Sequence, residues 1–301
     1  MMLLGAIAAA AIALAVTGAT VVNPHSHAPR AAPDPVPHPT ATASPSPSSP
    51  IPSTPPRKGL STAERRRLTR AIADYLGNAP LAVSIRDLTT GASFAYQDTK
   101  EFATASIVKV DILATLLLQA QRAGRSLTVV EKATATQMIE YSDNNAATAL
   151  WHDIGGGSGL EEANRRLGLR CTIPGPGGYW GSTSTCTADQ LRLLAALTTN
   201  RSPLNAAAKN YLLRLMASVT PSQAWGVSVG ASTGDAISLK NGWLSRPRDG
   251  GAWAVNTIGR IHGDGHDYLI AVLSDHSSTM SAGVDKVEHV TRLVVSALSH
   301  A

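Results

Sequence analysis

The apolar run from Ile107 to Leu118 is the feature of this sequence that most strongly constrains its fold. Its apolar residues lie too close together for a helix with one face in water, which predicts a helix buried among other helices. Ser106 stands directly before the run, and Lys109 follows it by three positions, on the same helical face. The chain is therefore expected to fold around a buried helix whose first turn carries a serine and a lysine.

Ser106 and Lys109 in this arrangement are the components of a nucleophile with its own base. A backbone N–H in the first helical turn has no partner within the helix, and the helix dipole favours negative charge there, so an oxyanion formed on attack would be stabilised. Lys109 can accept the serine proton only when neutral, which requires burial or a second cation to lower its pKa from about 10.4. Taken alone, the pattern also fits a helix N-cap followed by a solvated lysine.

Two further motifs follow in order along the chain. Ser-Asp-Asn occupies residues 142–144, and Lys-Asn-Gly occupies residues 240–242. The order Ser-x-x-Lys, Ser-Asp-Asn, Lys-Thr-Gly marks serine β-lactamases and penicillin-binding proteins. Here the first two motifs match fully and the third matches in two of its three positions. The chain therefore resembles the class A β-lactamase-like serine hydrolases over roughly residues 60 to 300.

The resemblance implies a role for each catalytic position. Ser106 would be the acylated nucleophile, with Lys109 as its base, acting directly or through a water. Ser142 would relay a proton to the leaving nitrogen. Lys240 would lie close to Ser142 and add positive charge that helps to keep Lys109 neutral. Asp143 is expected to bond backbone at its turn.

The same resemblance implies four substrate contacts. The Asn144 amide would hold the acyl side chain of a substrate. Asn241 and Gly242 would lie along the substrate on the sheet edge, and the N–H group of Trp243 would complete the oxyanion hole with that of Ser106. No cofactor and no metal ion is expected, and the substrate is expected to be a small molecule or a fragment of peptidoglycan, bound by a monomer.

Three departures limit what the resemblance implies. Asn241 replaces the threonine or serine whose hydroxyl anchors a substrate carboxylate, and its amide can donate less compactly. Only 36 positions separate Ser106 from Ser142, so a segment that forms one wall of the pocket in typical β-lactamases is expected to be absent. Class A enzymes deacylate with a glutamate after the Ser-Asp-Asn helix, yet residues 169–188 contain none. Glu161 and Glu162 come earlier and fit solvated helix positions.

Three classes of function stay open on these residues. The favoured one is a serine hydrolase that is acylated by a β-lactam or a related amide and deacylates slowly. The second is a D-alanyl-D-alanine peptidase of the penicillin-binding kind. The third is a catalytically idle module that binds cell wall.

The first 58 residues predict export. Residues 3–22 form an apolar run long enough for a signal-peptide core or for one membrane span. No charged residue precedes Arg30, which leaves open a start codon further upstream. The small residues near Ala19 and Ala28 give no clean Ala-x-Ala cleavage site, which leaves open an uncleaved anchor. Residues 23–58 hold 12 of the chain's 18 prolines and cannot bury enough apolar surface to fold, which predicts an extended stalk. The expected division is a signal or anchor at 1–22, a stalk at 23–58 and an extracytoplasmic catalytic domain at 59–301.

The folded part is predicted to be an α+β domain. A capping box at Ser61 and Glu64 begins a first helix that ends near Gly77. Strand patterns at 81–88 and 93–98 flank a hairpin turn, and further strand patterns lie at 236–243, 252–261 and 268–274. Residues 106 to about 219 have helical periodicity, and an amphipathic helix closes the chain. We expect an antiparallel sheet built from these N- and C-terminal strands, flanked by the terminal helices and an inserted helical block.

The two cysteines, Cys171 and Cys186, lie 15 positions apart. In an exported domain such a pair predicts a disulfide in preference to two free thiols. The bond would rigidify a segment rich in glycine and proline. No further ligand stands at a zinc spacing from them.

Two other motifs suggest different chemistry. Gly-Val-Ser-Val-Gly at 226–230 fits a nucleophile elbow, with later Asp and His residues as triad partners, but the parallel strand and the helix that an elbow needs are missing around it. His262, Asp264 and His266 resemble a metal cluster, although Asp-Gly between two strand patterns is more simply a hairpin tip.

Arginines at 65, 66, 67 and 70 ring the first helix, but few aromatic residues and no nucleic-acid-binding motif accompany them, so nucleic-acid binding is not expected.

Overall fold

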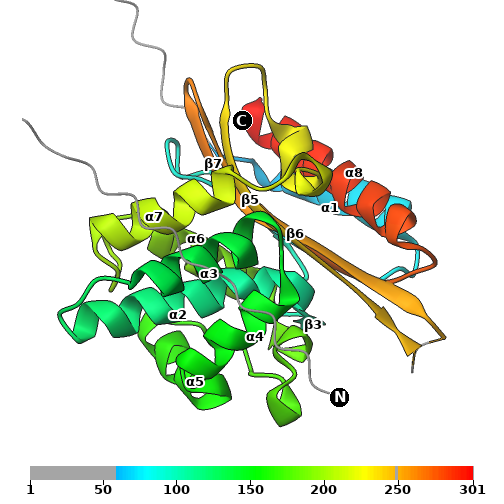
Figure 1. Ribbon diagram of the computed structural model, residues 1–301. Coiled ribbons are helices and arrows are strands. Elements are labelled where there is room, and N and C mark those ends of the chain that lie inside the picture. Colours follow the sequence, from blue (N-terminus) through cyan, green and yellow to red (C-terminus); the bar gives the residue numbers. More distant parts are fainter. Residues whose placement is uncertain (1–58, 248–249, 301) are drawn as a thin grey trace, which may run out of the picture. The chain divides into compact units, whose positions relative to one another are not determined.

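The computed structural model describes residues 59–247 and 250–300, and the predicted signal or anchor (1–22) and stalk (23–58) lie outside them. One antiparallel sheet, in the order β2-β1-β7-β6-β5, stands between two layers of helices. Figure 1 shows α1 and α8 on one face of this sheet and the helical block α2–α7 on the other. The predicted α+β class, with strands from both ends of the domain in one sheet, is confirmed.

The strands and helices follow the sequence pattern closely. The sheet strands are β1 (Leu81–Asp87), β2 (Ser93–Tyr96), β5 (Ala236–Arg246), β6 (Ala252–Gly263) and β7 (His266–Ser277). The helices are α1 (Thr62–Leu76), α2 (Val108–Arg122), α3 (Val129–Glu140), α4 (Asn144–Asp153), α5 (Gly156–Leu167), α6 (Thr187–Thr198), α7 (Ala206–Ala217) and α8 (Met280–Ser299). The three C-terminal strands are longer than their patterns predicted, because the polar residues at their ends continue the ladders.

Alternation along the central strand β7 divides the core in two. Leu269, Ala271 and Leu273 pack against the helical block, whereas Ile270 and Val272 pack on the side of α1 and α8. Successive side chains of a strand point to opposite faces, so a strand buried on both faces serves two cores. The helical block is thereby fixed to one face of the sheet, and the serine-lysine turn lies where the two meet.

The buried helix predicted at Ile107–Leu118 is present, but it begins differently. Residues 105–107 form a 3-10 turn (η1), and α2 starts at Val108. Nearly every α2 residue as far as Leu118 is buried, including Lys109 and Asp111. Ala105, directly before Ser106, has a φ of 47°, a conformation that an alanine adopts only at an energetic cost and that surrounding structure must maintain.

A small second sheet, which the sequence did not predict, flanks this turn. β3 (Phe102–Ala103) pairs antiparallel with β4 (Ser184–Thr185), and the Thr104 N–H donates to the Thr183 carbonyl at 2.8 Å. Two-residue strands carry too little periodicity to be seen in a sequence. Their consequence is that the segment 171–186 is fastened to the residues that lead into Ser106.

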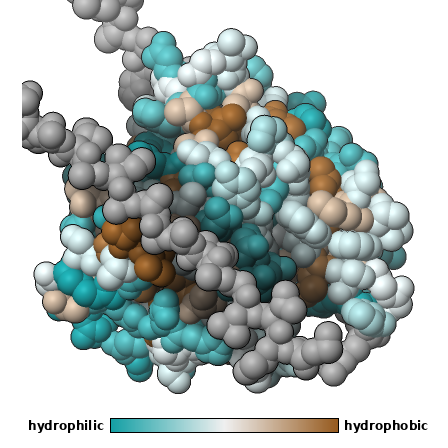
Figure 2. Space-filling view, in the orientation of Figure 1, coloured by the Kyte–Doolittle hydropathy of each residue, from teal (hydrophilic) through white to brown (hydrophobic). Residues whose placement is uncertain are grey.

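Figure 2 shows apolar side chains on the surface in several separate patches with hydrophilic side chains between them. The most exposed large apolar residues among those described are Val129 and Val130 at the start of α3, with 84% and 74% of their surface accessible, and Tyr179, with 74%. Scattered exposed apolar residues of this kind are normal in soluble domains. Within residues 59–247 and 250–300, no helix combines the length and apolar character needed to cross a membrane.

Candidate active site

The Ser106 turn lies on the sheet at Gly242. A methyl group on Gly242 would lie only 2.7 Å from the Ser106 nitrogen and 2.8 Å from the Thr104 carbonyl oxygen, so only hydrogen fits there. Its cross-strand neighbour, Asn256, is fully buried and donates from Nδ2 to the carbonyls of Ala103 (2.8 Å) and Thr104 (3.1 Å). One glycine and one asparagine of neighbouring strands therefore hold the backbone that presents Ser106.

The amine of Lys109 is fully buried and donates three hydrogen bonds. Nζ contacts the Ser142 carbonyl oxygen (2.5 Å), Ser142 Oγ (3.1 Å) and Asn144 Oδ1 (2.8 Å). No hydrogen bond joins Lys109 to the Ser106 hydroxyl among the described residues, although their spacing predicted that the amine reaches it. The loop between α3 and α4 takes up the amine instead, and bonds to a nucleophile commonly form only when substrate is bound.

Ser142 is shared by two lysines. Lys240 Nζ, also fully buried, donates to Ser142 Oγ at 3.0 Å, to Gln223 Oε1 at 3.3 Å and to the carbonyl oxygen of Asn241 at 3.2 Å. A hydroxyl that accepts from two amines keeps its own hydrogen to donate elsewhere. Ser142 has a φ of 57°, and strained backbone of this kind gathers at functional sites. The arrangement allows Ser142 to pass a proton to a nearby atom.

Both lysines lose basicity in this environment. Burial lowers the pKa of Lys109 to about 8, although the carboxylate of Asp143 partly opposes it. Burial, and then the charge of Lys109, lowers the pKa of Lys240 to about 7. Neutral amines are therefore accessible near neutral pH, and a neutral lysine can act as a general base. Burial is the main cause of both pKa shifts. The resemblance had implied that the positive charge of Lys240 helps to keep Lys109 neutral.

The predicted substrate contacts lie in two different settings. The Asn144 side chain stands at the start of α4 and bonds Lys109, and Asp143 caps this helix by accepting from the Ala146 N–H at 2.7 Å. Lys240 and Gly242 face the helical block, so Asn241 and Trp243, one position out of phase, face the other side of β5. The Trp243 side chain packs there near Trp225; the prediction for Trp243 concerned its backbone N–H alone.

Asn241 requires a correction to its predicted role. Its side chain is fully buried, and Nδ2 donates to the carbonyls of Gln223 (2.7 Å) and Trp225 (3.0 Å). Both amide hydrogens are therefore used within the protein, and none is left for a substrate carboxylate. The amide instead ties β5 to the preceding loop.

Three residues of this site were not predicted from the sequence. Gln223 accepts from Lys240 and donates to the Tyr141 carbonyl at 2.9 Å. Asn256 holds the Ser106 turn, as described above. The Trp180 ring centre lies 5.0 Å from Lys109 Nζ. A polar residue in the middle of a buried strand was an available signal for Asn256, but Gln223 and Trp180 are brought in by loops whose sequence carries no such signal.

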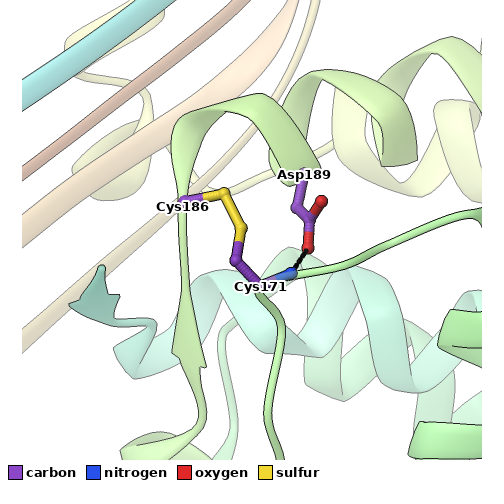
Figure 3. Close-up of side chains that lie close together, drawn as sticks. All are labelled: Cys171, Cys186 and Asp189. Atoms are coloured by element: carbon purple, nitrogen blue, oxygen red, sulfur yellow. Dashed lines mark hydrogen bonds between the residues drawn. A yellow bond between two sulfur atoms is a disulfide. The ribbon is translucent and has the colours of Figure 1, made fainter. Parts of the chain in front are cut away.

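The predicted disulfide between Cys171 and Cys186 is present, with the two Cα atoms 6.0 Å apart. Figure 3 shows the buried Asp189 beside it, its carboxylate directed at the Cys171 backbone. Asp189 Oδ2 accepts from the N–H groups of Arg170 and Cys171, both at 2.7 Å, and from the Thr172 hydroxyl. The three side chains lie close enough to surround an ion, but both sulfurs are joined to each other, and Asp189 serves as an anchor for the start of the segment.

A cleft of about 720 Å³ lies between the end of β5 and the disulfide-closed segment, and Ser106 is not among the residues that line it. Leu244 and Arg246 of β5 line it together with Pro176 and Tyr179 of the segment, and Ala103 of β3 also contributes. Apolar and aromatic residues predominate in it, as in most clefts that accept small molecules.

The alternative motifs have structural explanations. Residues 226–230 form a 3-10 helix before β5, and the Ser228 hydroxyl donates to the Ala224 carbonyl at 2.7 Å, so no nucleophile elbow is formed. The turn between β6 and β7 pairs Gly263 with His266, which confirms the hairpin tip. His266 Nε2 lies 3.1 Å from Asp235 Oδ2, outside the predicted cluster.

Comparison with known proteins decides the family. A family model described as "Beta-lactamase enzyme family" matches residues 64–132 and 117–298. The chain belongs to this family. The family that the three motifs predicted is therefore confirmed.

Curated relatives match part of this chain. The "Putative lipoprotein LppW" of Mycobacterium tuberculosis and of Mycobacterium bovis is 29% identical over 174 residues, which are 55% of this chain and 54% of the relative. The chain thus spans about half the length of these curated relatives.

The solved structures share the fold. A PBP-A mutant in an acyl-enzyme complex with penicillin G has a TM-score of 0.69 at 19% identity and covers 82% of this chain and 100% of its own. The TLA-1 extended-spectrum β-lactamase has a TM-score of 0.69 at 17% identity and covers 78% of this chain and 99% of its own. A variant of the class A β-lactamase of the last common ancestor of Gram-negative bacteria has a TM-score of 0.66 at 21% identity, with coverage of 79% and 99%.

Proposed function

We propose that this protein is an exported serine hydrolase that forms an acyl-enzyme on Ser106 with a β-lactam or a related amide and releases the acyl group slowly. The observation that carries the proposal is the Ser142 hydroxyl, which accepts from both buried amines, Lys109 and Lys240. A shared hydroxyl beside two weakly basic lysines is a route for a proton from a nucleophile to a leaving nitrogen.

The chemical steps follow from these groups. The neutral Lys109 amine takes the proton of the Ser106 hydroxyl as its oxygen bonds the carbonyl carbon of the substrate. The negative oxygen that develops lies at the N-terminal end of α2, where the backbone N–H of Ser106 and the helix dipole stabilise it. Ser142 then gives its proton to the leaving nitrogen as the amide C–N bond breaks, and it regains a proton from one of the two amines.

Slow release is proposed because the segment that faces Lys109 supplies no base. Residues 170–186 contain no aspartate, glutamate or histidine, and general-base assistance is typically worth about 10²–10⁴-fold in rate. The same observation favours a second candidate, a D-alanyl-D-alanine peptidase that β-lactams would inactivate by long-lived acylation. The lipoprotein name of the LppW relatives supports an extracytoplasmic location, to which the apolar run at 3–22 would direct this chain.

Labelling with a fluorescent penicillin tests the proposal. The wild-type chain should gain one label, located on Ser106 by peptide mass, and Ser106→Ala should gain none. Lys109→Ala should also lose nearly all labelling, because removing one member of a nucleophile–base pair costs almost as much as removing both. Equal labelling of wild type and Ser106→Ala would refute the site, and an unlabelled wild type would favour an idle wall-binding module.

A further inference from the structure

The indole of Trp180 covers the amine of Lys109. The ring centre lies 5.0 Å from Nζ, within the range in which an aromatic face contacts an ammonium group. Lys109 has no exposed surface, whereas Trp180 is half-buried, so the indole stands between the amine and solvent. Nζ also donates to the carbonyl oxygen and the hydroxyl of Ser142 and to Oδ1 of Asn144. Water that approaches Nζ from outside on this side must displace the ring.

Several contacts hold the ring in this place. Trp180 Nε1 donates to the Thr148 hydroxyl on α4 at 3.1 Å. The segment that carries the ring is closed by the Cys171–Cys186 disulfide and anchored at its start by Asp189. At its other end, the Thr183 carbonyl accepts from the Thr104 N–H, two residues before Ser106. The indole is therefore bonded to α4, and the segment that carries it is bonded to the residues that lead into Ser106.

We propose that Trp180 is a positioning residue that keeps water from the Lys109 amine and so sets the lifetime of an acyl group on Ser106; this inference rests on the proposed function. Hydrolysis needs a water whose oxygen bonds the acyl carbon while one of its protons passes to a base. The ester bond to Ser106 Oγ then breaks, and the proton returns to that oxygen. Lys109 is a base for this step only where water can hydrogen-bond its amine, and the indole occupies that approach.

The lifetime of the acyl-enzyme provides the first test. Each full-length variant is acylated with a fluorescent penicillin, freed of excess reagent and followed by intact-protein mass. Trp180→Ala should lose the adduct at least about tenfold faster than wild type, a fraction of the 10²–10⁴-fold that base assistance supplies. Trp180→Phe, which keeps a ring over Nζ, should stay within about threefold of wild type, and Thr148→Val should lie between them. Trp253→Ala, which removes a half-buried indole on the other core, is the matched control and should behave as wild type.

A second measurement does not depend on penicillin. Reductive methylation with formaldehyde, followed by peptide mass, reports which lysine amines a small reagent reaches. Lys109 should be protected in wild type and methylated at least about tenfold faster in Trp180→Ala, while Lys240, buried under other residues, should stay protected in both. Thermal melting confirms that the variants are folded.

The two measurements separate the two ideas. An adduct in folded Trp180→Ala that lasts as long as in wild type would overturn the barrier, and so would unchanged protection of Lys109. A wild type that takes no adduct, but in which Trp180→Ala exposes Lys109, would refute the proposed function and leave the shielding of the amine established.

Discussion

Replacing Gly242 by alanine should displace the nucleophile turn. The added methyl carbon would stand 2.7 Å from the Ser106 nitrogen, 2.8 Å from the Ile107 nitrogen and 2.8 Å from the Thr104 oxygen, whereas ordinary contact begins at 3.4 Å. All three are backbone atoms, so no side chain can rotate away. The turn must therefore move from β5 by about 0.7 Å, the difference between 3.4 and 2.7 Å.

Both stability and acylation should respond to this shift. Overpacking of this kind costs about 1–3 kcal/mol, which corresponds to about 2–4 °C in melting temperature for each kcal/mol in a domain of this size. A misplacement of about 1 Å can cost about 10²-fold in rate, so penicillin labelling of Ser106 should slow by a factor of tens or more.

Gly59→Ala is the matched control, because a methyl group there meets its nearest atoms at 3.6 Å. Its melting temperature and labelling rate should equal those of the wild type. If Gly242→Ala melts and labels as the wild type does, the turn does not rest on this glycine, and the geometry described for the site is wrong. The melting temperature tests the packing even if no penicillin reacts.

Three further predictions concern charge and the disulfide. The labelling rate of Ser106 should rise as the pH increases from about 6 to about 9, because Lys109, with its pKa lowered to about 8, accepts a proton only when neutral; a rate that is flat over this range would contradict the role of the amine. Burial raises the pKa of Asp111 from 3.8 to about 8, so the folded state keeps a proton that the unfolded state loses. The free energy of unfolding should therefore fall as the pH rises from 3.8 to about 8. Asp111→Asn should flatten this fall in urea titrations at several pH values, and an unchanged slope would count against the assignment. Replacing Cys171 and Cys186 together by alanine should lower the free energy of unfolding by about 3 kcal/mol in urea, the loop-entropy value for a closed loop of this length; a loss below about 1 kcal/mol would mean that Asp189 alone holds the segment.

Asp111 also shows how the helical block is held together beneath the site. Its carboxyl accepts from the Asn164 amide of α5 at 3.0 Å when that amide is placed with its nitrogen inward. The group is completely buried two positions after Lys109. A carboxyl in such surroundings stays protonated near neutral pH because the charged form is poorly solvated there.

The sequence by itself was enough to predict the family and the class of fold, and it supplied the motifs from which acylation of Ser106 is proposed. Local signals were sufficient for these: the capping box at Ser61, the continuous apolar run after Ser106, the hairpin turns and the order of three short motifs. The same local alternation already implied that Asn241 faces away from Lys240, because neighbouring strand residues point to opposite faces. Its amide hydrogens bond the carbonyls of Gln223 and Trp225 on that side.

Only the tertiary structure decided which groups the two lysines bond and which ring lies over Lys109. Lys109 bonds Ser142 and Asn144, Gln223 reaches Lys240 from a loop, and Trp180 lies over an amine 71 positions earlier in the chain. These contacts depend on how strands and helices far apart in the sequence pack, and no local pattern encodes such distances. Burial lowers the pKa of both lysines, and burial is a property of the assembled core, so their chemistry could not be read from the motifs that named them.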